Sequence, residues 1–270
     1  MQGYTCIRLQ ANVFSTFPLL LIAKSILDYH NLPATFFIAS QTIGKKEEFW
    51  WDELESIFLL SKKLPAKFSS NINGNKITFD LGQEVHLTDE LQKHQLRWDA
   101  SKESPPTVRC KLFFKVWQQL RPLSYSEQQF QLQQIRQWAE ISPSMRPEYR
   151  SMSLEHLHSL GSSKLHTIGG HTLSHPALAY HAKELQRYEL LENRSFLKTQ
   201  VNKEINLIAY PYGNYNQETI TILNEEGFHG AFTTEAQKVT AVSDPYKLGR
   251  FQVSNLAPHA FEQQLQRWQS

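Results

Sequence analysis

Apolar residues recur at three- and four-residue steps between positions 19 and 30, and Asn31 follows the last of them. This spacing predicts an amphipathic helix that ends near Asn31. Residues 34–39 come next and are apolar nearly throughout, with β-branched and aromatic side chains. Such a run is typical of a parallel strand that is covered on both faces. The chain therefore opens with a helix and a buried strand of an α/β fold.

The same alternation returns after residue 150. The pattern predicts helices over 153–161, 182–199 and 217–226, and strands over 165–168, 205–209, 230–233 and 251–253. Alternation of this kind predicts a parallel sheet, open or closed into a barrel, with functional residues at the carboxyl ends of the strands. A length of 270 residues suits a single domain of this class.

Residues 45–150 interrupt the alternation with a mainly helical stretch that is rich in aromatic residues. Two strand-like runs flank Asn73-Gly74 and predict a hairpin near 68–81, because both residues tolerate positive φ. Ser124 and Glu127 have the spacing of a capping box that opens a helix toward Trp138. We expect an insertion into a single domain of residues 1–270. Aromatic residues spaced on helices favour a core, and a carbohydrate platform is the alternative.

Composition excludes several classes of partner. The chain has 28 basic and 26 acidic residues and a net charge of +2, which argues against nucleic acid. Cys6 and Cys110 form no CxxC pair and are expected to be buried thiols. The apolar run at 17–23 is too short to span a bilayer and lacks the flanking residues of a secretion signal. We therefore expect no membrane span and, by default, a cytoplasmic protein.

Two histidines, His171 and His175, follow a predicted strand and the pair Gly169-Gly170. We expect them at the start of a helix, where a spacing of four places both imidazoles on one face, within reach of a cation such as zinc. They could instead cap the helix or lie at the surface. Thr172 stands where the metalloprotease motif His-Glu-x-x-His has its glutamate, which disfavours that chemistry.

A second motif, Tyr210-Pro211-Tyr212-Gly213, ends the strand predicted at 205–209. The proline and glycine predict a tight turn that can expose a backbone amide, and such an amide can stabilise an oxyanion. The alternative is an ordinary turn at the end of a strand. Pro211, Tyr212 and Gly213 are accordingly candidate substrate-binding residues.

Together these motifs resemble those of the polysaccharide deacetylases, carbohydrate esterase family four. Further similar segments are found at 32–37, 227–234 and 248–250, so that the resemblance extends from about residue 20 to 255. The stretch at 45–150 is similar to that of a subgroup with a long second loop.

The resemblance implies a distorted (β/α) barrel that binds one divalent ion, zinc, through two histidines and an aspartate. It implies His171 and His175 as metal ligands, the backbone amide of Tyr212 as oxyanion donor, and Arg250 as a residue that organises charge near the catalytic base. The implied reaction removes acetyl groups from an acetylated polysaccharide or glycan, by hydrolysis of an amide or ester bond.

The chain departs from the family at its first strand, where a pair of aspartates supplies the third ligand and the base. By alignment those positions are Val13 and Phe14, and no acidic residue precedes Asp28. The third ligand is therefore not identifiable, and we expect weak zinc binding and little turnover. One explanation is a pseudoenzyme that acts as a carbohydrate-binding or interaction protein. The other, which we favour, is that a frameshift or mis-set start replaced the authentic first strand.

Overall fold

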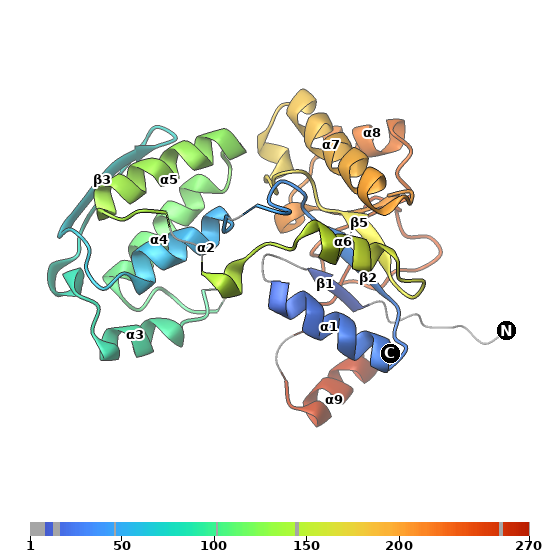
Figure 1. The fold of residues 1–270 in the computed structure, drawn as a ribbon, viewed down its shortest axis with the longest axis horizontal. Coiled ribbons are helices and arrows are strands. Elements are labelled where there is room, and N and C mark those ends of the chain that lie inside the picture. The colour runs from blue at the N-terminus through green and yellow to red at the C-terminus, as the bar shows by residue number, and fades with distance from the viewer. Residues whose placement is uncertain are drawn as a thin grey trace. The chain divides into compact units, whose positions relative to one another are not determined.

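The computed structural model describes residues 9–12, 17–45, 47–100, 102–143, 146–253 and 256–269 (Figure 1). The chain forms two compact units. The first, called here the sheet unit, comprises Met1–Phe14, Leu21–Gln41 and Leu154–Ser270, and the second, the helical unit, comprises Ser15–Leu20 and Thr42–Ser153. The boundaries of the helical unit lie close to those of the predicted segment 45–150. Its origin as an insertion into one domain stays a prediction.

A five-stranded parallel sheet forms the centre of the sheet unit, in the order β1-β2-β5-β6-β7. The strands are β1 (Leu9–Asn12), β2 (Ala34–Ile38), β5 (Thr167–Gly170), β6 (Leu207–Ala209) and β7 (Gly230–Phe232). All five residues of β2 are buried, as their continuous apolar pattern predicts. The α/β class with a parallel sheet is thus confirmed. The described strands form an open sheet with β1 and β7 at its edges, and they do not close into the expected barrel.

A first strand is present in the sheet. β1 pairs in parallel with β2, from Leu9 opposite Ala34 to Asn12 opposite Phe37. The positions aligned with the family's aspartates, Val13 and Phe14, lie outside the described residues.

Two predicted strands differ from those observed. β5 begins at Thr167 rather than at 165, because the hydroxyl of Ser163 accepts hydrogen bonds from the amides of Leu165 and His166 and holds both in a turn. The strand then includes both glycines of the Gly169-Gly170 pair. The strand predicted at 251–253 is wrong. The residue that pairs with β7 is Leu248, which precedes the predicted strand. Its amide donates to the carbonyl of Ala231, and its carbonyl accepts from the amide of Thr233.

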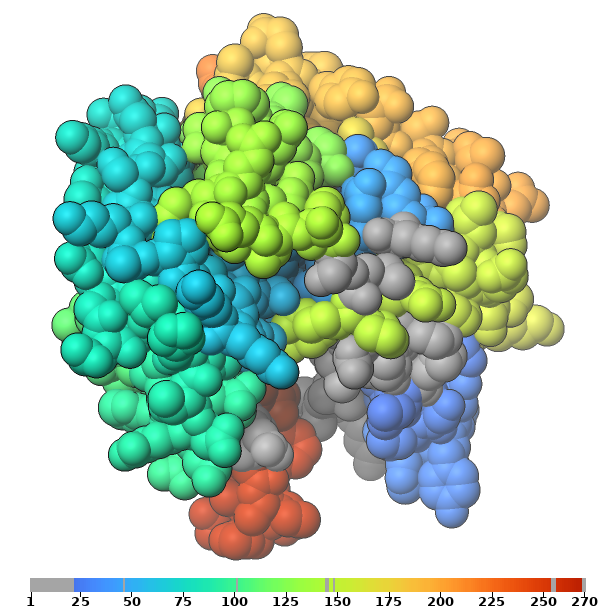
Figure 2. All heavy atoms as spheres, turned by 60° about the vertical axis from the view of Figure 1, so that its left-hand side comes forward, coloured from blue at the N-terminus to red at the C-terminus, as the bar shows by residue number. Residues whose placement is uncertain are grey.

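The helices predicted outside the segment 45–150 are confirmed within two residues. They are α1 (Phe17–Tyr29), α6 (Leu154–Gly161), α7 (Lys183–Val201) and α8 (Gln217–Glu225), and α9 (Pro258–Gln269) follows near the end of the chain. α7 packs against β5, α6 and α8, and it contributes to the orange surface at the top of Figure 2. None of the helices in the described ranges is both long and apolar enough to cross a bilayer.

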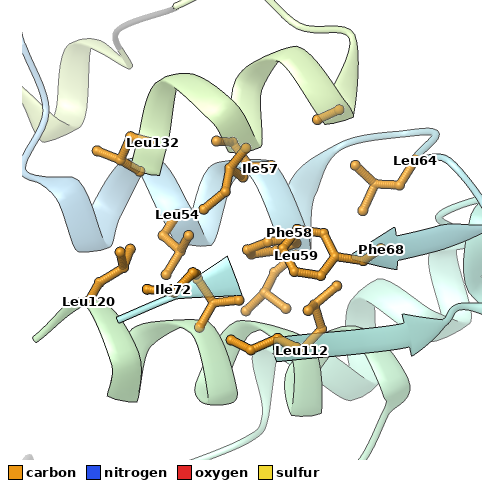
Figure 3. Packing of buried hydrophobic residues seen from close by; sticks show 14 of the residues in the cluster. Leu54, Ile57, Phe58, Leu59, Leu64, Phe68, Ile72, Leu112, Leu120 and Leu132 are labelled. Carbon is orange, nitrogen blue, oxygen red and sulfur yellow. The ribbon is translucent and has the colours of Figure 1, made fainter. Parts of the chain in front are cut away.

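The helical unit has a core of its own, shown in Figure 3. Its elements are α2 (Trp50–Glu55) with a π-helical turn (Ser56–Leu60), the hairpin β3 (Lys67–Ile72) and β4 (Asn75–Asp80), α3 (Asp89–Leu96), α4 (Val108–Leu120) and α5 (Tyr125–Ala139). The hairpin turn at Asn73-Gly74 and the capping box of Ser124 and Glu127 are both confirmed. Apolar side chains from α2, the hairpin, α4 and α5 meet in this core.

The aromatic residues of the helical unit belong mainly to this core. Trp50 is buried, and Trp51, Trp98, Trp117 and Trp138 are partly buried against the same cluster. Their placement confirms the core interpretation over that of a sugar platform. Cys110 also lies in this core as a buried free thiol, as expected, whereas Cys6 lies outside the described residues.

Arg109 lies fully buried at the centre of the same unit. Its guanidinium donates hydrogen bonds to the carbonyl oxygens of Phe58, Ser61, Glu84 and Val85. The carboxylate of Glu84 in turn accepts hydrogen bonds from the amides of Val108 and Arg109 at the start of α4, at 2.9 and 2.8 Å. One buried cation therefore ties the π-helical turn and the Glu84 segment to α4.

Candidate functional site

The segment from His171 to His175 follows β5 as a loop, not as the start of a helix. Thr172 and His175 have φ of 64° and 66°, which no right-handed helix contains. The Thr172 hydroxyl donates to the carbonyl of His171 and accepts from the amide of His175 at 3.0 Å. A threonine that bonds its neighbouring backbone in this way competes with helix formation, and Pro176 follows directly. The expectation of a helix was therefore wrong.

The loop nevertheless brings the two imidazoles together. Their ring centroids are 4.7 Å apart, and each residue is only 2% exposed. The Nδ1 atom of His171 donates to the carbonyl oxygen of Ala209 at 2.6 Å, which leaves the lone pair on Nε2. Metal-binding histidines are commonly oriented by such a bond from their second nitrogen to a carbonyl.

Burial keeps both imidazoles neutral. It lowers the pKa of His171 to about 3, and the positive charge of Arg250 acts in the same direction. Burial and the neighbouring His171 hold the pKa of His175 well below its usual value. Neutral imidazole is the form that binds a metal ion, so neither histidine would have to lose a proton near neutral pH to bind one.

The second motif forms a tight turn at the end of β6. The amide of Gly213 bonds to the carbonyl of Tyr210 at 3.0 Å, and Tyr212 and Gly213 have φ of 57° and 65°. A Cβ atom on Gly213 would lie 2.2 Å from the hydroxyl oxygen of Thr234. Glycine is required there both for the backbone conformation and for the space.

The turn and the histidine loop lie in contact. The ring of Tyr212 meets that of His175 edge to face, with centroids 4.6 Å apart. Beyond the turn, the Asn214 side chain accepts a hydrogen bond from the amide of Ala179 at 2.8 Å, four residues after His175. The structure therefore brings His171, His175 and the Tyr210–Gly213 motif into one site.

Backbone strain also concentrates at this site. Outside glycine, positive φ occurs among the described residues at Asn31, Asn73, Glu140, Asn202, Thr172, His175 and Tyr212. The first four lie in turns or at helix ends, and three of them are asparagine, which tolerates this conformation. The remaining three all belong to the two motifs. Because such conformations persist only where the surroundings impose them, their clustering points to a functional site.

Arg250 is held beside this site by the backbone. Its Nε donates a hydrogen bond to the carbonyl oxygen of Thr233 at 2.6 Å. Its backbone amide donates to the carbonyl oxygen of Glu235 at 2.8 Å. Burial lowers the pKa of Arg250 to about 10, so its guanidinium remains charged at neutral pH. That charge lowers the pKa of His171. The expected role of Arg250 near a catalytic base stays a prediction.

The residues present fit only part of a metal site. Two buried, neutral and oriented imidazoles suit a borderline ion such as zinc. Within the described ranges, no three side chains of histidine, cysteine, aspartate or glutamate are grouped so that they could share an ion. That His171 and His175 bind a metal ion therefore stays a prediction.

Some residues that shape the site were not predicted from the sequence. Asn214, which follows the turn, bonds to Ala179, four residues after His175, and Glu189 and Asn193 on α7 bond to the histidine loop. The available signal was polar residues at positions 186, 189 and 193, which share the face of α7 that must be buried.

The comparisons with known proteins agree with these motifs. Residues 147–231 match the model of the polysaccharide deacetylase family. The poly-beta-1,6-N-acetyl-D-glucosamine N-deacetylase of Staphylococcus epidermidis is 30% identical over 87 residues, which cover 32% of this chain and 27% of that protein. The enzyme of the same name from Staphylococcus aureus strain MSSA476 is 31% identical over 86 residues, 32% of this chain and 27% of that protein. The chain thus spans less than a third of the length of these relatives.

Among solved structures, the deacetylase domain of BpsB from Bordetella bronchiseptica is similar, with 11% identity and a TM-score of 0.46 over 88% of this chain and 67% of that chain. The family resemblance predicted from the two motifs is confirmed by the match over residues 147–231. Residues 147–231 are thus similar to the polysaccharide deacetylases.

Proposed function

We propose that this chain carries a metal-dependent deacetylase site for an acetylated glycan, and that its catalytic set is incomplete as the chain stands. The observation that supports this most is the pair of neutral, buried imidazoles of His171 and His175, packed against the Tyr210–Gly213 turn. In this proposal they are the ligands of one divalent ion, and zinc suits a site with histidine ligands.

The residues of the chain have distinct parts in the proposed reaction. His171 and His175 would hold a zinc ion, which would supply Lewis acidity toward an acetyl carbonyl and a water molecule. The left-handed backbone at Tyr212 orients its amide for the oxyanion, while Pro211 and Gly213 shape the substrate-binding turn. Arg250 contributes positive charge beside the histidines. The Ala209 carbonyl keeps His171 in the tautomer that leaves Nε2 for the ion.

The missing element is a carboxylate. A general base contributes about 10² to 10⁴ in rate, and an aspartate ligand adds charge that strengthens metal binding. Val13 and Phe14 occupy the aligned positions. A second candidate function is that of a catalytically impaired relative, which binds carbohydrate or another partner. It is favoured because, within the described ranges, no three histidine, cysteine, aspartate or glutamate side chains are grouped to hold an ion.

The substrate class is inferred from the relatives. The staphylococcal proteins are named as N-deacetylases of poly-beta-1,6-N-acetyl-D-glucosamine, and we propose an acetylated glycan for this chain, with the acetyl group on nitrogen or oxygen. We also propose that the open sheet belongs to a distorted barrel and that residues 45–150 are an insertion into it.

Zinc binding and acetate release test this proposal separately. The purified, metal-free chain is titrated with Zn²⁺ by calorimetry, and acetate release from acetylated glucosamine oligomers is then measured with zinc present. We expect weak binding that His171→Ala abolishes, and little acetate. His259, an exposed histidine of α9, provides the control variant His259→Ala, which should bind like the unchanged chain. Zinc binding that survives His171→Ala would overturn the ligand assignment, and rapid acetate release would overturn the account of the base.

A further inference from the structure

The histidine loop needs support, because Thr172 and His175 hold it in a strained conformation. Part of that support comes from β2. The amides of Ser40 and Gln41, just beyond this strand, both donate to the carbonyl of Leu173, at 3.1 and 2.8 Å. The loop also bonds to α7, which packs against β5.

α7 presents a line of buried polar side chains. Gln186, Glu189 and Asn193 are 0%, 4% and 1% exposed, and their spacing places them on one face of the helix. Buried polar groups are costly unless each is hydrogen-bonded, and a carboxylate is the costliest of the three. Their partners therefore indicate what they stabilise.

Glu189 bonds to the middle of the histidine loop. Its two carboxylate oxygens accept from the amide of Ser174 at 2.8 Å and from the Ser174 hydroxyl at 2.5 Å. Its backbone carbonyl accepts from the amide of Leu173 at 3.0 Å. Three hydrogen bonds from one residue thus hold the backbone immediately before His175.

Asn193 bonds to the start of the loop. Its Oδ1 accepts from the amide of His171 at 3.2 Å, while its Nδ2 donates to the carbonyl of Ile38 and the hydroxyl of Ser40, both at 2.9 Å. A Cβ atom on Gly170 would lie 2.6 Å from the same Oδ1. The glycine before His171 therefore leaves room for this amide to approach the loop.

We propose that Glu189 and Asn193 are positioning residues, which hold the backbone of His171–His175 from α7 so that both imidazoles keep a metal-binding arrangement. Their hydrogen bonds go to Ser174, Leu173 and the amide of His171. The inference rests on the proposed function, since it takes the two histidines as the ligands.

The test compares Glu189→Gln with Gln186→Met. Glutamine has the shape of glutamate but turns an amide group toward one of the two donors of Ser174. Gln186 is the matched control, because it is buried on the same helix and bonds to His181 and Thr219 instead of the loop. In the metal-free proteins, NMR follows the imidazole signals of His171 and His175 and the hydrogen exchange of the Ser174 amide.

We expect Glu189→Gln to shift both imidazole signals and to speed exchange of the Ser174 amide, while Gln186→Met leaves them unchanged. Titration with Zn²⁺ alone should show binding weakened about 10-fold or more by Glu189→Gln, the effect typical of residues that orient metal ligands. The milder variant Ser174→Ala, which removes one donor, should act in the same direction. The double variant Glu189→Gln with Ser174→Ala should lose less Zn²⁺ affinity than the two single variants lose in sum, because both substitutions break the same contact.

Each outcome separates this inference from the proposed function. If the unchanged chain does not bind zinc, the proposed function is wrong, and the metal-free NMR comparison still decides on the positioning role. If it binds zinc and both Glu189→Gln and Ser174→Ala bind as tightly, with undisturbed imidazole signals, the positioning role is wrong and the ligand assignment stands.

Discussion

The Nδ1 atom of His171 lies 2.6 Å from the carbonyl oxygen of Ala209, across the pairing of β5 with β6. Ala209 is the last residue before the Tyr210–Gly213 turn. The strand that carries the second motif therefore orients the first histidine of the first motif. This contact gives a physical reason why the two motifs are more informative together than either is alone.

The low pKa of His171 predicts how folding responds to acid. An unfolded histidine titrates near pH 6.5, whereas the pKa of folded His171 is about 3. Between these values the unfolded state binds a proton that the folded state does not, so stability falls as the pH is lowered through this window. We expect His171→Gln to reduce the slope of unfolding free energy against pH by about 1.4 kcal/mol per pH unit. Urea unfolding at pH 6, 5 and 4 measures it, and equal slopes for both proteins would contradict the assigned burial.

Replacement of Gly213 by alanine should destabilise the sheet unit. The new Cβ would combine a positive φ with a contact of 2.2 Å to the Thr234 hydroxyl. The control is Gly74→Ala in the hairpin turn, where φ is also positive but nothing lies within 4 Å of the added atom. We expect Gly74→Ala to lower the free energy of unfolding by about 1–2 kcal/mol, from the backbone conformation alone. The decrease should be larger for Gly213→Ala.

The double variant Gly213→Ala with Thr234→Ala should recover part of that difference, since it removes the closest atom. Thermal unfolding and denaturant titration provide the measurement. Equal losses at Gly74 and Gly213 would show that the contact with Thr234 has no energetic weight.

Arg109 is expected to be indispensable to the helical unit. In Arg109→Met, the carbonyls that bond the guanidinium lose their donor, and Glu84 loses the buried charge opposite it. Breaking a buried charged network of this kind costs about 3–5 kcal/mol. Lys111→Met, at an exposed position of the same helix, should change stability little. Unfolding followed by tryptophan fluorescence tests this, because Trp50, Trp51, Trp98, Trp117 and Trp138 belong to the core of the unit. A small effect of Arg109→Met would be the contrary result.

Asn214→Ala should loosen the contact between the segments that follow the two motifs. The amide of Ala179 loses its 2.8 Å acceptor, while the turn itself keeps the bond from Gly213 to Tyr210. A lost hydrogen bond of this kind costs about 0.5–1.5 kcal/mol. Faster hydrogen exchange at Ala179, with little change at Gly213, is the expected NMR result. Unchanged exchange at Ala179 would mean that the contact is not formed in solution.

Local sequence determined most of the helices and strands. The boundaries of α1, β2 and the hairpin follow from apolar spacing and from Asn73-Gly74, because these signals act over a few neighbouring residues. The predictions failed where a side chain bonded to nearby backbone. Ser163 delays the start of β5, and Thr172 turns an expected helix into a loop. Leu248, rather than residues 251–253, pairs with β7. This pairing depends on a strand elsewhere in the chain, so the local sequence pattern does not predict it.

The sequence by itself determined which residues carry the candidate chemistry, His171, His175 and the Tyr210–Gly213 motif. Only the tertiary structure decided how they meet. The neutrality of the imidazoles comes from burial, the orientation of His171 from a carbonyl on another strand, and the support of the loop from Glu189 and Asn193 on α7. Burial and hydrogen bonding between segments distant in the chain depend on how the strands and helices pack, and residue spacing alone does not encode them.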